Sequence, residues 1–381
     1  MAGGSRWTAS LLAVWRITSP GSLPRALAFL IAGVLFWVMG SASVGHSPNV
    51  IVSGHTGGVF STSLHAHALW LAAGDAAAPP SAAVEAAFRA ARRTLKPDNS
   101  SYLALCLHVK DEHDSIREWV LYHHMIGVNK FYVFDDYSAP PMQGVLSDLI
   151  EAGLVDYTFA MGQLPGPTEG ANKQDQAYNY CLRKHGQNHK YMGFIDTDEF
   201  VMLMRRYSTL PELLRDYEDS SGLVLYIVDF GPSGHVARPA AGVLASYTKC
   251  TEKWRQGGYG KSFVQPAKTR AMARVHRGHY TQGHAVDVWR RKYDGPTTAG
   301  NRTDDERAMI FHYRTKSAED WQKRDRKGTS GTGGPTKPLS VFQTVDKWAD
   351  QVCLEGTEQA ARLRAAFGPL LRAPRRQDGL T

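Results

Sequence analysis

The chain has 381 residues, an apolar content of 43% and a formal net charge of +8, so it can hold one large domain with accessory segments or two ordinary domains. The basic surplus favours an acidic partner such as a nucleotide or an anionic lipid, while the lack of zinc-finger, RRM and KH signatures argues against nucleic acid. Four cysteines without Cys-x-x-Cys spacing exclude a zinc ribbon and a thioredoxin-type motif, and leave open four free thiols or up to two disulfides.

The amino-terminal region contains an apolar segment long enough to cross a membrane. Residues 26–44 carry no charge and are rich in Leu, Ile, Val, Phe and Ala. Arg6, Arg16 and Arg25 precede them and few basic residues follow closely, so the positive-inside bias predicts a cytosolic tail at 1–25 and a type II signal-anchor at 26–44. A signal peptide cleaved near residues 40–43 is the competing interpretation, and a soluble core helix is a third.

A stretch of low periodicity separates this segment from the rest. Residues 45–100 are rich in Gly, Ser, Ala, His and Pro, which predicts a flexible stem. A helical pattern over 81–95 closes it.

A strand, a helix and a second strand follow. The apolar run 102–109 ends in Lys110, Asp111 and Glu112, and helical spacing begins near residue 114. After a turn at 127–129, the apolar run 130–134 ends in Asp135 and Asp136. This order predicts a βαβ unit with parallel strands and right-handed connectivity.

The central strand is predicted at residue 191 and delivers the acids Asp196, Asp198 and Glu199, after helical patterns at 144–152 and 175–183. On an extended segment Asp196 and Asp198 would share a face, with Glu199 pointing elsewhere. Two hard oxygen donors suit Mg²⁺ or Mn²⁺ that also binds a substrate diphosphate. The alternative is an acid cluster that caps a following helix.

Further elements complete the pattern. A short helix is predicted at 210–217 and a strand at 222–230, followed by a basic and aromatic segment that runs to about residue 327. A helix containing Trp321 leads to a Gly- and Pro-rich loop up to residue 338, and the last helices are predicted at 341–352 and 358–367.

Several strands therefore end in acids at one edge of a mostly parallel sheet, which is where open α/β folds bind ligands. No Gly-rich phosphate loop is present, which argues against Rossmann dehydrogenases and P-loop enzymes. The pattern resembles the Rossmann-like nucleotide-sugar domain of GT-A glycosyltransferases, an α/β fold, here preceded by a single transmembrane helix.

Over about residues 102–328 the chain resembles the family 92 glycosyltransferases, formerly a domain of unknown function. The resemblance depends on ordered blocks at 110–112, 118–123, 127–128, 131–138, 174–182, 194–200, 230–235, 261–266 and 312–317. It implies a GT-A domain at 101–328, followed by a C-terminal loop and helices at 329–381.

The resemblance implies transfer of a sugar, often galactose, from a UDP-sugar to a glycan or glycoprotein acceptor in the Golgi lumen, with inversion at the anomeric carbon. A divalent ion, Mn²⁺ or Mg²⁺, would neutralise the leaving diphosphate. An inverting displacement also needs a base near the attacking hydroxyl. The protein would be a single-pass type II Golgi membrane enzyme with its catalytic domain in the lumen.

Candidate site residues follow from these expectations. The predicted metal ligands are Asp196 and Asp198 of the DXD motif, together with His312. Nucleotide-sugar binding is assigned to Lys110, Glu112, Asp135, Asp136, Gln174, Asp196 and Lys261, and the competing candidates for the base are Asp229 and His235. The alternative to substrate or metal binding is a purely structural role for these residues: strand caps, turn hydrogen bonds, solvated surface or local hydrogen bonding.

Other functions remain open. One is a catalytically inactive, membrane-anchored protein that binds glycans or nucleotides, which the intact Asp196 and Asp198 argue against. Another is a membrane-tethered interaction protein that uses the basic segment 249–291. A phosphotransferase is disfavoured by the missing phosphate loop.

Overall fold

The computed structural model describes residues 102–159, 172–252, 259–274, 276–295, 307–327 and 337–372, with isolated positions at 86, 90, 93, 95 and 164. The predicted tail, anchor, nearly all of the stem and most of the loop before residue 338 therefore lie outside the described residues. Within the described ranges, no helix has both the length and the apolar character needed to cross a membrane.

The chain alternates strands and helices. The strands are β1 (Leu103–Val109), β2 (Lys130–Asp135), β3 (Val155–Phe159), β4 (Tyr191–Phe194), β5 (Glu199–Leu203), β6 (Gly222–Asp229), β7 (Lys249–Cys250), β8 (Gly260–Val264), β9 (Thr269–Arg274), β10 (Arg277–Tyr280), β11 (Ala285–Asp287), β12 (Ala308–His312) and β13 (Gln351–Val352). The α-helices are α4 (Ile116–Met125), α5 (Gln143–Glu151), α6 (Lys173–His185), α7 (Leu210–Arg215), α8 (Val243–Ser246), α9 (Ala318–Lys327), α10 (Leu339–Trp348) and α11 (Glu355–Phe367), and short 3₁₀ turns occupy Gly186–Asn188, Pro266–Lys268 and Gly368–Leu371.

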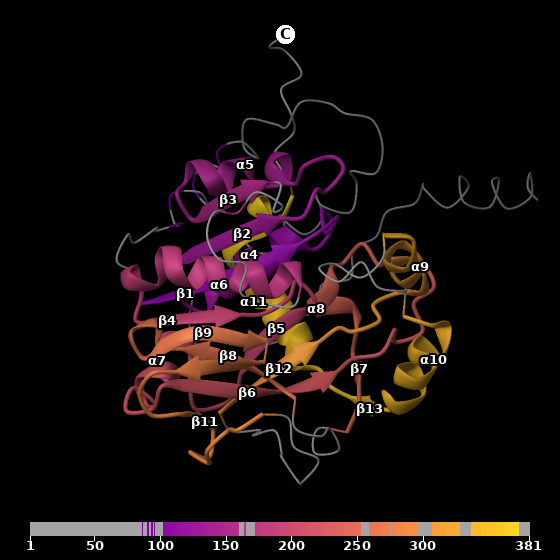
Figure 1. Cartoon of the computed structure of the whole chain (residues 1–381). Coiled ribbons are helices and arrows are strands. Elements are labelled where there is room, and N and C mark those ends of the chain that lie inside the picture. The colour runs from indigo at the N-terminus through magenta and orange to yellow at the C-terminus, as the bar shows by residue number, and fades with distance from the viewer. Residues whose placement is uncertain are drawn as a thin grey trace, which may run out of the picture. The chain divides into compact units, whose positions relative to one another are not determined.

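A mainly parallel sheet forms the centre of the described part, as Figure 1 shows. Its order is β3-β2-β1-β4-β8-β6-β12-β5, with β11 beside β6. Strands β1 to β4 are mutually parallel, and β6 is parallel to β11 and β12. Strand β8 is antiparallel to both β4 and β6, and β5 is antiparallel to β12. The expected α/β class and mostly parallel sheet are confirmed.

Both faces of the sheet are buried, which explains the continuous apolar runs in its strands. In β1, Leu105 and Leu107 pack into the larger core with α4, α5 and α11, while Ala104 and Cys106 face α6 in a second core. Successive side chains of a strand point to opposite faces, so this alternation assigns α6 to one layer and α4, α5 and α11 to the other.

Helix α4 is tied to β5 through a buried histidine. The His123 ring donates from Nδ1 to the carbonyl oxygen of Trp119 (2.8 Å) and accepts at Nε2 from the backbone N–H of Val201 (3.3 Å). Burial lowers the pKa of His123 to about 3, so the ring is neutral at physiological pH. Trp119 itself donates its indole N–H to the carbonyl oxygen of Glu199 at 2.8 Å.

Helix α6 is fixed at three places. The Asn172 side chain caps its first turn by accepting from Asp175 N at 2.9 Å. A disulfide joins Cys181 of the helix to Cys106 of β1. The Asn179 amide pairs with both backbone groups of Met272 in β9 at 2.7 and 3.1 Å.

A second disulfide, between Cys250 of β7 and Cys353, holds the C-terminal segment. No free cysteine remains, because each of the four sulfurs lies in one of these two bridges within the described residues. The predicted helix at 341–352 is wrong at its end. Helix α10 stops at Trp348, and β13 turns to pair antiparallel with β7 next to the disulfide.

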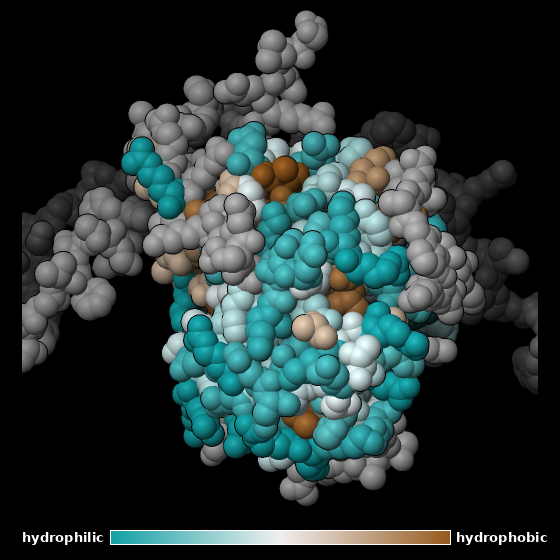
Figure 2. Space-filling model, turned by 60° about the vertical axis from the view of Figure 1, so that its left-hand side comes forward, coloured by the Kyte–Doolittle hydropathy of each residue, from teal (hydrophilic) through white to brown (hydrophobic). Residues whose placement is uncertain are grey.

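The other predicted elements within the described ranges agree in type, including the βαβ unit of β1, α4 and β2, while the predicted helix at 81–95 lies almost entirely outside the described residues. The face turned forward in Figure 2 is mostly hydrophilic where it is not grey, with a few small apolar spots. The part of this face that is not grey therefore carries no broad apolar patch.

Candidate active site

The predicted acids lie where β4 ends and the chain turns into β5. The backbone N–H of Glu199 donates to the carbonyl oxygen of Asp196 at 3.0 Å, which closes a turn over residues 196–199. The prediction that Asp196 and Asp198 share a face, with Glu199 pointing elsewhere, is therefore wrong. It assumed an extended segment, whereas the turn places Asp196 with Glu199 on one side and Asp198 on another.

Asp196 and Glu199 share one buried lysine. The Nζ atom of Lys261, in β8, lies 2.8 Å from Asp196 Oδ2 and 3.1 Å from Glu199 Oε2, and Lys261 is only 1% exposed. Gln174 on α6 donates to Asp196 Oδ1 at 2.5 Å, and Tyr178 lies 3.3 Å from the same oxygen. The Asp196 carboxylate is thus held by side chains of both α6 and β8.

The charges of this cluster support one another. Burial alone would lower the pKa of Lys261, but the two carboxylates outweigh it and raise the pKa, so the lysine stays charged. Burial raises the pKa of Glu199 to about 7, against the opposing effect of Lys261. Burial also acts to raise the pKa of Asp196, but Lys261 overcomes it and the net shift is downward.

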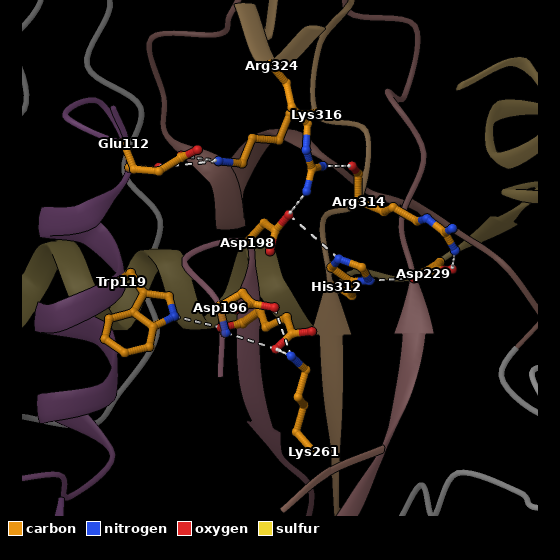
Figure 3. A network of polar contacts seen from close by, with 12 residues as sticks. Glu112, Trp119, Asp196, Asp198, Asp229, Lys261, His312, Arg314, Lys316 and Arg324 are labelled. Atoms are coloured by element: carbon orange, nitrogen blue, oxygen red, sulfur yellow. Dashed lines mark hydrogen bonds and ion pairs between the residues drawn. The ribbon is translucent and has the colours of Figure 1, made fainter. Parts of the chain in front are cut away.

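Asp198 faces a different set of groups, which Figure 3 shows. Its Oδ2 lies 3.6 Å from His312 Nε2 and 3.4 Å from a guanidinium nitrogen of Arg324 on α9. His312 ends β12, and its Nδ1 lies 2.7 Å from Oδ1 of Asp229 at the end of β6. Arg314 donates to the other Asp229 oxygen at 2.8 Å. The chain therefore builds a continuous row from Asp198 through His312 and Asp229 to Arg314.

The row is electrostatically complementary. Burial opposes the charged imidazolium of His312, but Asp198 and Asp229 outweigh this effect and raise its pKa to about 10. Burial likewise acts against the charged carboxylates, yet His312 and Arg314 lower the pKa of Asp229 to about 2, and His312 and Arg324 hold that of Asp198 well below its usual range. A positive charge at Nε2 of His312, whether a proton or a metal ion, is therefore favourable.

The donor set of this row suits Mn²⁺ or Mg²⁺. Imidazole nitrogen and carboxylate oxygen are suitable ligands, and a ligating histidine commonly donates its other ring N–H to a carboxylate, as His312 does to Asp229. In the described part of the chain, no three His, Cys, Asp or Glu side chains come together as a metal-binding group. Asp198 and His312 would thus be two protein ligands, with the remaining positions left for phosphate and water.

A pocket of about 340 Å³ opens beside Asp198. Its lining is almost entirely charged and consists of Asp111, Glu112, Asp114, Asp198, Arg238, Thr315, Lys316, Asp320, Lys323 and Arg324. Its volume is in the range of small-molecule sites. Glu112 is paired with Lys316 across the pocket at 3.1 Å.

The two acids after β2 have different surroundings. Asp135 is fully buried and accepts from Ser138 N (2.8 Å), Met142 N (3.0 Å) and the Tyr157 hydroxyl (2.5 Å), so it performs the turn-forming role that was its alternative. Asp136 is paired with Lys173 at 2.7 Å. Their predicted nucleotide contacts stay predictions.

The remaining candidates occupy varied positions. Lys110 is half-buried just after β1 and does not line the pocket. His235 faces the carbonyl oxygen of Ser246 through Nε2 at 3.0 Å and does not line the pocket either. With its pKa near 2, Asp229 is better suited to orienting His312 than to accepting a proton. The Nζ atom of Lys261 contacts two of the protein's own carboxylates, those of Asp196 and Glu199.

Several contributors to the site had no assigned role in the sequence interpretation. Arg314 lies two residues after His312, and this spacing was a usable signal because alternate residues of an extended segment point the same way. Glu199 was visible as an acid but was expected to point away. Arg324 carried no signal, since it is one of many charged residues on a polar helix.

The known proteins to which this chain is similar are named as glycosyltransferase family 92 proteins. The family model of glycosyltransferase family 92 matches residues 102–339. A glycosyltransferase family 92 protein of Ricinus communis is 28% identical over 156 residues, covering 38% of this chain and 26% of the relative. One of Oryza sativa subsp. japonica is 27% identical over 149 residues, covering 38% and 24%, and one of Arabidopsis thaliana is 23% identical over 156 residues, covering 38% and 26%.

The match to these relatives is local, since the chain spans about a quarter of the length of the curated proteins it resembles. The family model, in contrast, covers more than half of the chain and includes the acids after β4, the His312 row and all of α9. The chain belongs to glycosyltransferase family 92.

Proposed function

We propose that this protein is a metal-dependent, inverting glycosyltransferase that moves a sugar, galactose first among the candidates, from a UDP-sugar to a glycan or glycoprotein acceptor. The observation that carries the proposal is the placement of His312 between Asp198 and Asp229 at the edge of the sheet, in a chain of this family. Carboxylate, imidazole and an adjoining charged pocket suit a metal-bound diphosphate.

In this proposal, Asp198 and His312 hold Mn²⁺ or Mg²⁺. When bound, the ion supplies Lewis-acid neutralisation of the diphosphate, so the protein needs no strong acid of its own. Asp229 accepts the Nδ1 proton of His312 and so keeps Nε2 turned toward Asp198. Lys261 and Gln174 fix Asp196 beside the metal-binding turn.

We also propose a luminal, membrane-anchored location in the Golgi. Support comes from the two disulfides, because such bonds form and persist in oxidising compartments. The apolar, uncharged segment 26–44 is the proposed anchor.

The experiment is release of UDP or GDP from a panel of UDP- and GDP-sugars by the full chain purified in detergent, with Mn²⁺ or with EDTA. We expect metal-dependent release from one UDP-sugar, and a loss of at least about 100-fold in Asp198→Asn, whose fold is retained. Asp219→Asn is the matched control, since Asp219 is exposed and paired with the exposed Arg290, and does not line the pocket. Folded protein that releases nothing from any donor, even with pooled glycan acceptors, would refute the proposal.

A further inference from the structure

The Arg324 side chain lies next to the place beside Asp198 where a metal ion would bind. The side chain extends from α9 toward Asp198, as Figure 3 shows, and its guanidinium lies 3.4 Å from Asp198 Oδ2. Its other terminal nitrogen donates to the carbonyl oxygen of Arg314 at 2.8 Å. The side chain is 34% exposed and lines the pocket, so it can be reached from solvent.

Among the described residues, His312 and Arg324 form ion pairs with Asp198. A divalent ion bound to Asp198 and His312 would lie close to the Arg324 guanidinium. Like charges repel strongly at such short distances in a partly buried site. A metal that binds alone must therefore move Arg324 away from its carboxylate.

Most carboxylates around Arg324 already have a cationic partner. Among the described residues, Asp229 pairs with His312 and Arg314, Glu112 with Lys316, Asp320 with Arg238, and Glu319 with Lys323. Asp111 also lines the pocket, but one of its carboxylate oxygens accepts from the backbone N–H of Ala139 at 2.9 Å. An anion from outside the protein is therefore the more favourable partner for an arginine displaced from Asp198.

A further cation strengthens this need. Lys337 is half-buried and makes no ion pair with any described residue, and burial together with the charges of Arg324 and Arg314 lowers its pKa. The pocket wall around Arg324 also carries Lys316 and Lys323. Arginine and lysine groups of this kind bind phosphate oxygens well, arginine through two parallel N–H bonds.

We propose that Arg324 couples metal binding to nucleotide binding. Its guanidinium pairs with Asp198 until a nucleoside diphosphate binds. It then leaves Asp198 and pairs with the diphosphate, so that the divalent ion can bind beside Asp198. This inference depends on the proposed nucleotide-sugar chemistry. It assigns Arg324 a positioning role beyond simple phosphate binding, because Arg324 then opposes the metal when the nucleotide is absent.

The test measures Mn²⁺ binding by isothermal titration calorimetry, with and without saturating UDP, in the full chain and in Arg324→Gln. Wild-type protein is expected to bind Mn²⁺ at least about 10-fold more tightly with UDP, in the usual range of coupling between sites. In Arg324→Gln we expect Mn²⁺ alone to bind about 5-fold more tightly and UDP less tightly. A residue that only binds phosphate or only supports the fold would not tighten Mn²⁺ binding when removed.

Arg362→Gln is the matched control, because Arg362 lies on the exposed surface of α11, where it donates to the side chain of Gln359, and does not line the pocket. It should leave both affinities unchanged. If UDP and Mn²⁺ bind but Arg324→Gln leaves the affinity for Mn²⁺ alone equal or weaker, the coupling role of Arg324 is refuted and the proposed function stands. If neither UDP nor GDP binds to folded wild-type protein with or without Mn²⁺, both proposals fail.

A second measurement uses the unaltered protein and so does not depend on how the variant folds. Modification of Arg324 by phenylglyoxal, followed by peptide mass spectrometry, should be faster with Mn²⁺ alone than with no addition, because the metal releases Arg324 from Asp198. Mn²⁺ with UDP should protect it. Equal rates in all three conditions would contradict the exchange of partners.

Discussion

Replacing Lys261 by methionine removes the cation that lies between the buried carboxylate of Glu199 and the partly exposed carboxylate of Asp196. Asp196 and Glu199 both contact Nζ, within 3.1 Å, and Lys261 and Glu199 are each 1% exposed. Methionine fills much of the same volume but leaves two acids without their shared partner. The prediction is a large loss of stability whose size depends on pH.

The magnitude follows from burial. Removing one partner of a buried ion pair costs about 3–5 kcal/mol, because the remaining charge keeps its desolvation penalty. Here the remaining charge is two carboxylates that also repel each other. The cost should be larger at pH 8 than at pH 5.5, since Glu199, whose pKa is already raised to about 7, becomes neutral as the pH falls.

Urea unfolding of the oxidised protein, followed by tryptophan fluorescence at both pH values, measures this cost. Lys261→Met together with Glu199→Gln should recover at least about 1.5 kcal/mol, because only one carboxylate then remains. Lys292→Met is the control and should cost less than about 1 kcal/mol, since Lys292 and its partner Asp294 are exposed. A cost below about 1 kcal/mol for Lys261→Met, or no recovery in the double variant, would refute the reasoning.

Three further predictions concern other parts of the chain. Asp229→Asn should weaken Mn²⁺ binding in the presence of UDP by about 10–100-fold, measured by calorimetry, because His312 loses the carboxylate that orients it. In His123→Gln, the loss of unfolding free energy between pH 7.5 and pH 5 should be about 2 kcal/mol smaller than in wild type: the folded pKa of His123 is about 3, so the unfolded state takes up the proton first and stability falls as the pH drops below about 6.5. Cys250→Ser with Cys353→Ser should lower stability by about 2–5 kcal/mol in urea unfolding, since the lost bridge closes a long loop.

Each of these has a contrary outcome. Unchanged Mn²⁺ affinity in Asp229→Asn would show that the Asp229 carboxylate does not support metal binding by His312. Equal pH slopes with and without His123 would mean that its ring accepts a proton in the folded state. Identical electrophoretic mobility of wild type and the double cysteine variant without reductant, with equal stability, would contradict the Cys250–Cys353 bridge.

Local patterns predicted the elements that are built from consecutive residues. Three local patterns predicted β1, α4 and β2: the apolar run up to Val109, the helical spacing around Trp119, and the apolar run before Asp135. They were sufficient because a strand buried on both faces, or a helix buried along one stripe, shows this burial in the order of its apolar residues. The acids after Phe194 were found for the same reason. Strand β8 was not identified, because its place between β4 and β6 depends on pairing with distant segments.

In the candidate site, too, local patterns identified some residues, whereas others depend on how distant segments pack together. Asp198 and His312 were both singled out, and the structure brings them to 3.6 Å. The role of Lys261 could not be predicted, because a lysine becomes an internal counter-ion only when the sheet buries it beside carboxylates. Arg324 depends on how α9 packs, which no periodicity in a helix of charged residues reveals.

The position of β8 in the sheet and the pairing of β5 with β12 determine when strands can pair during synthesis. When β4 leaves the ribosome, the strand that covers its open edge is still to be made, and β5 must wait about a hundred residues for its partner in β12. At translation rates of about 5–20 residues per second, β5 stays unpaired for roughly 5–20 s. Throughout that interval Asp196 and Asp198 are attached to an unfinished sheet, so assembly of the site is among the last events in making this protein.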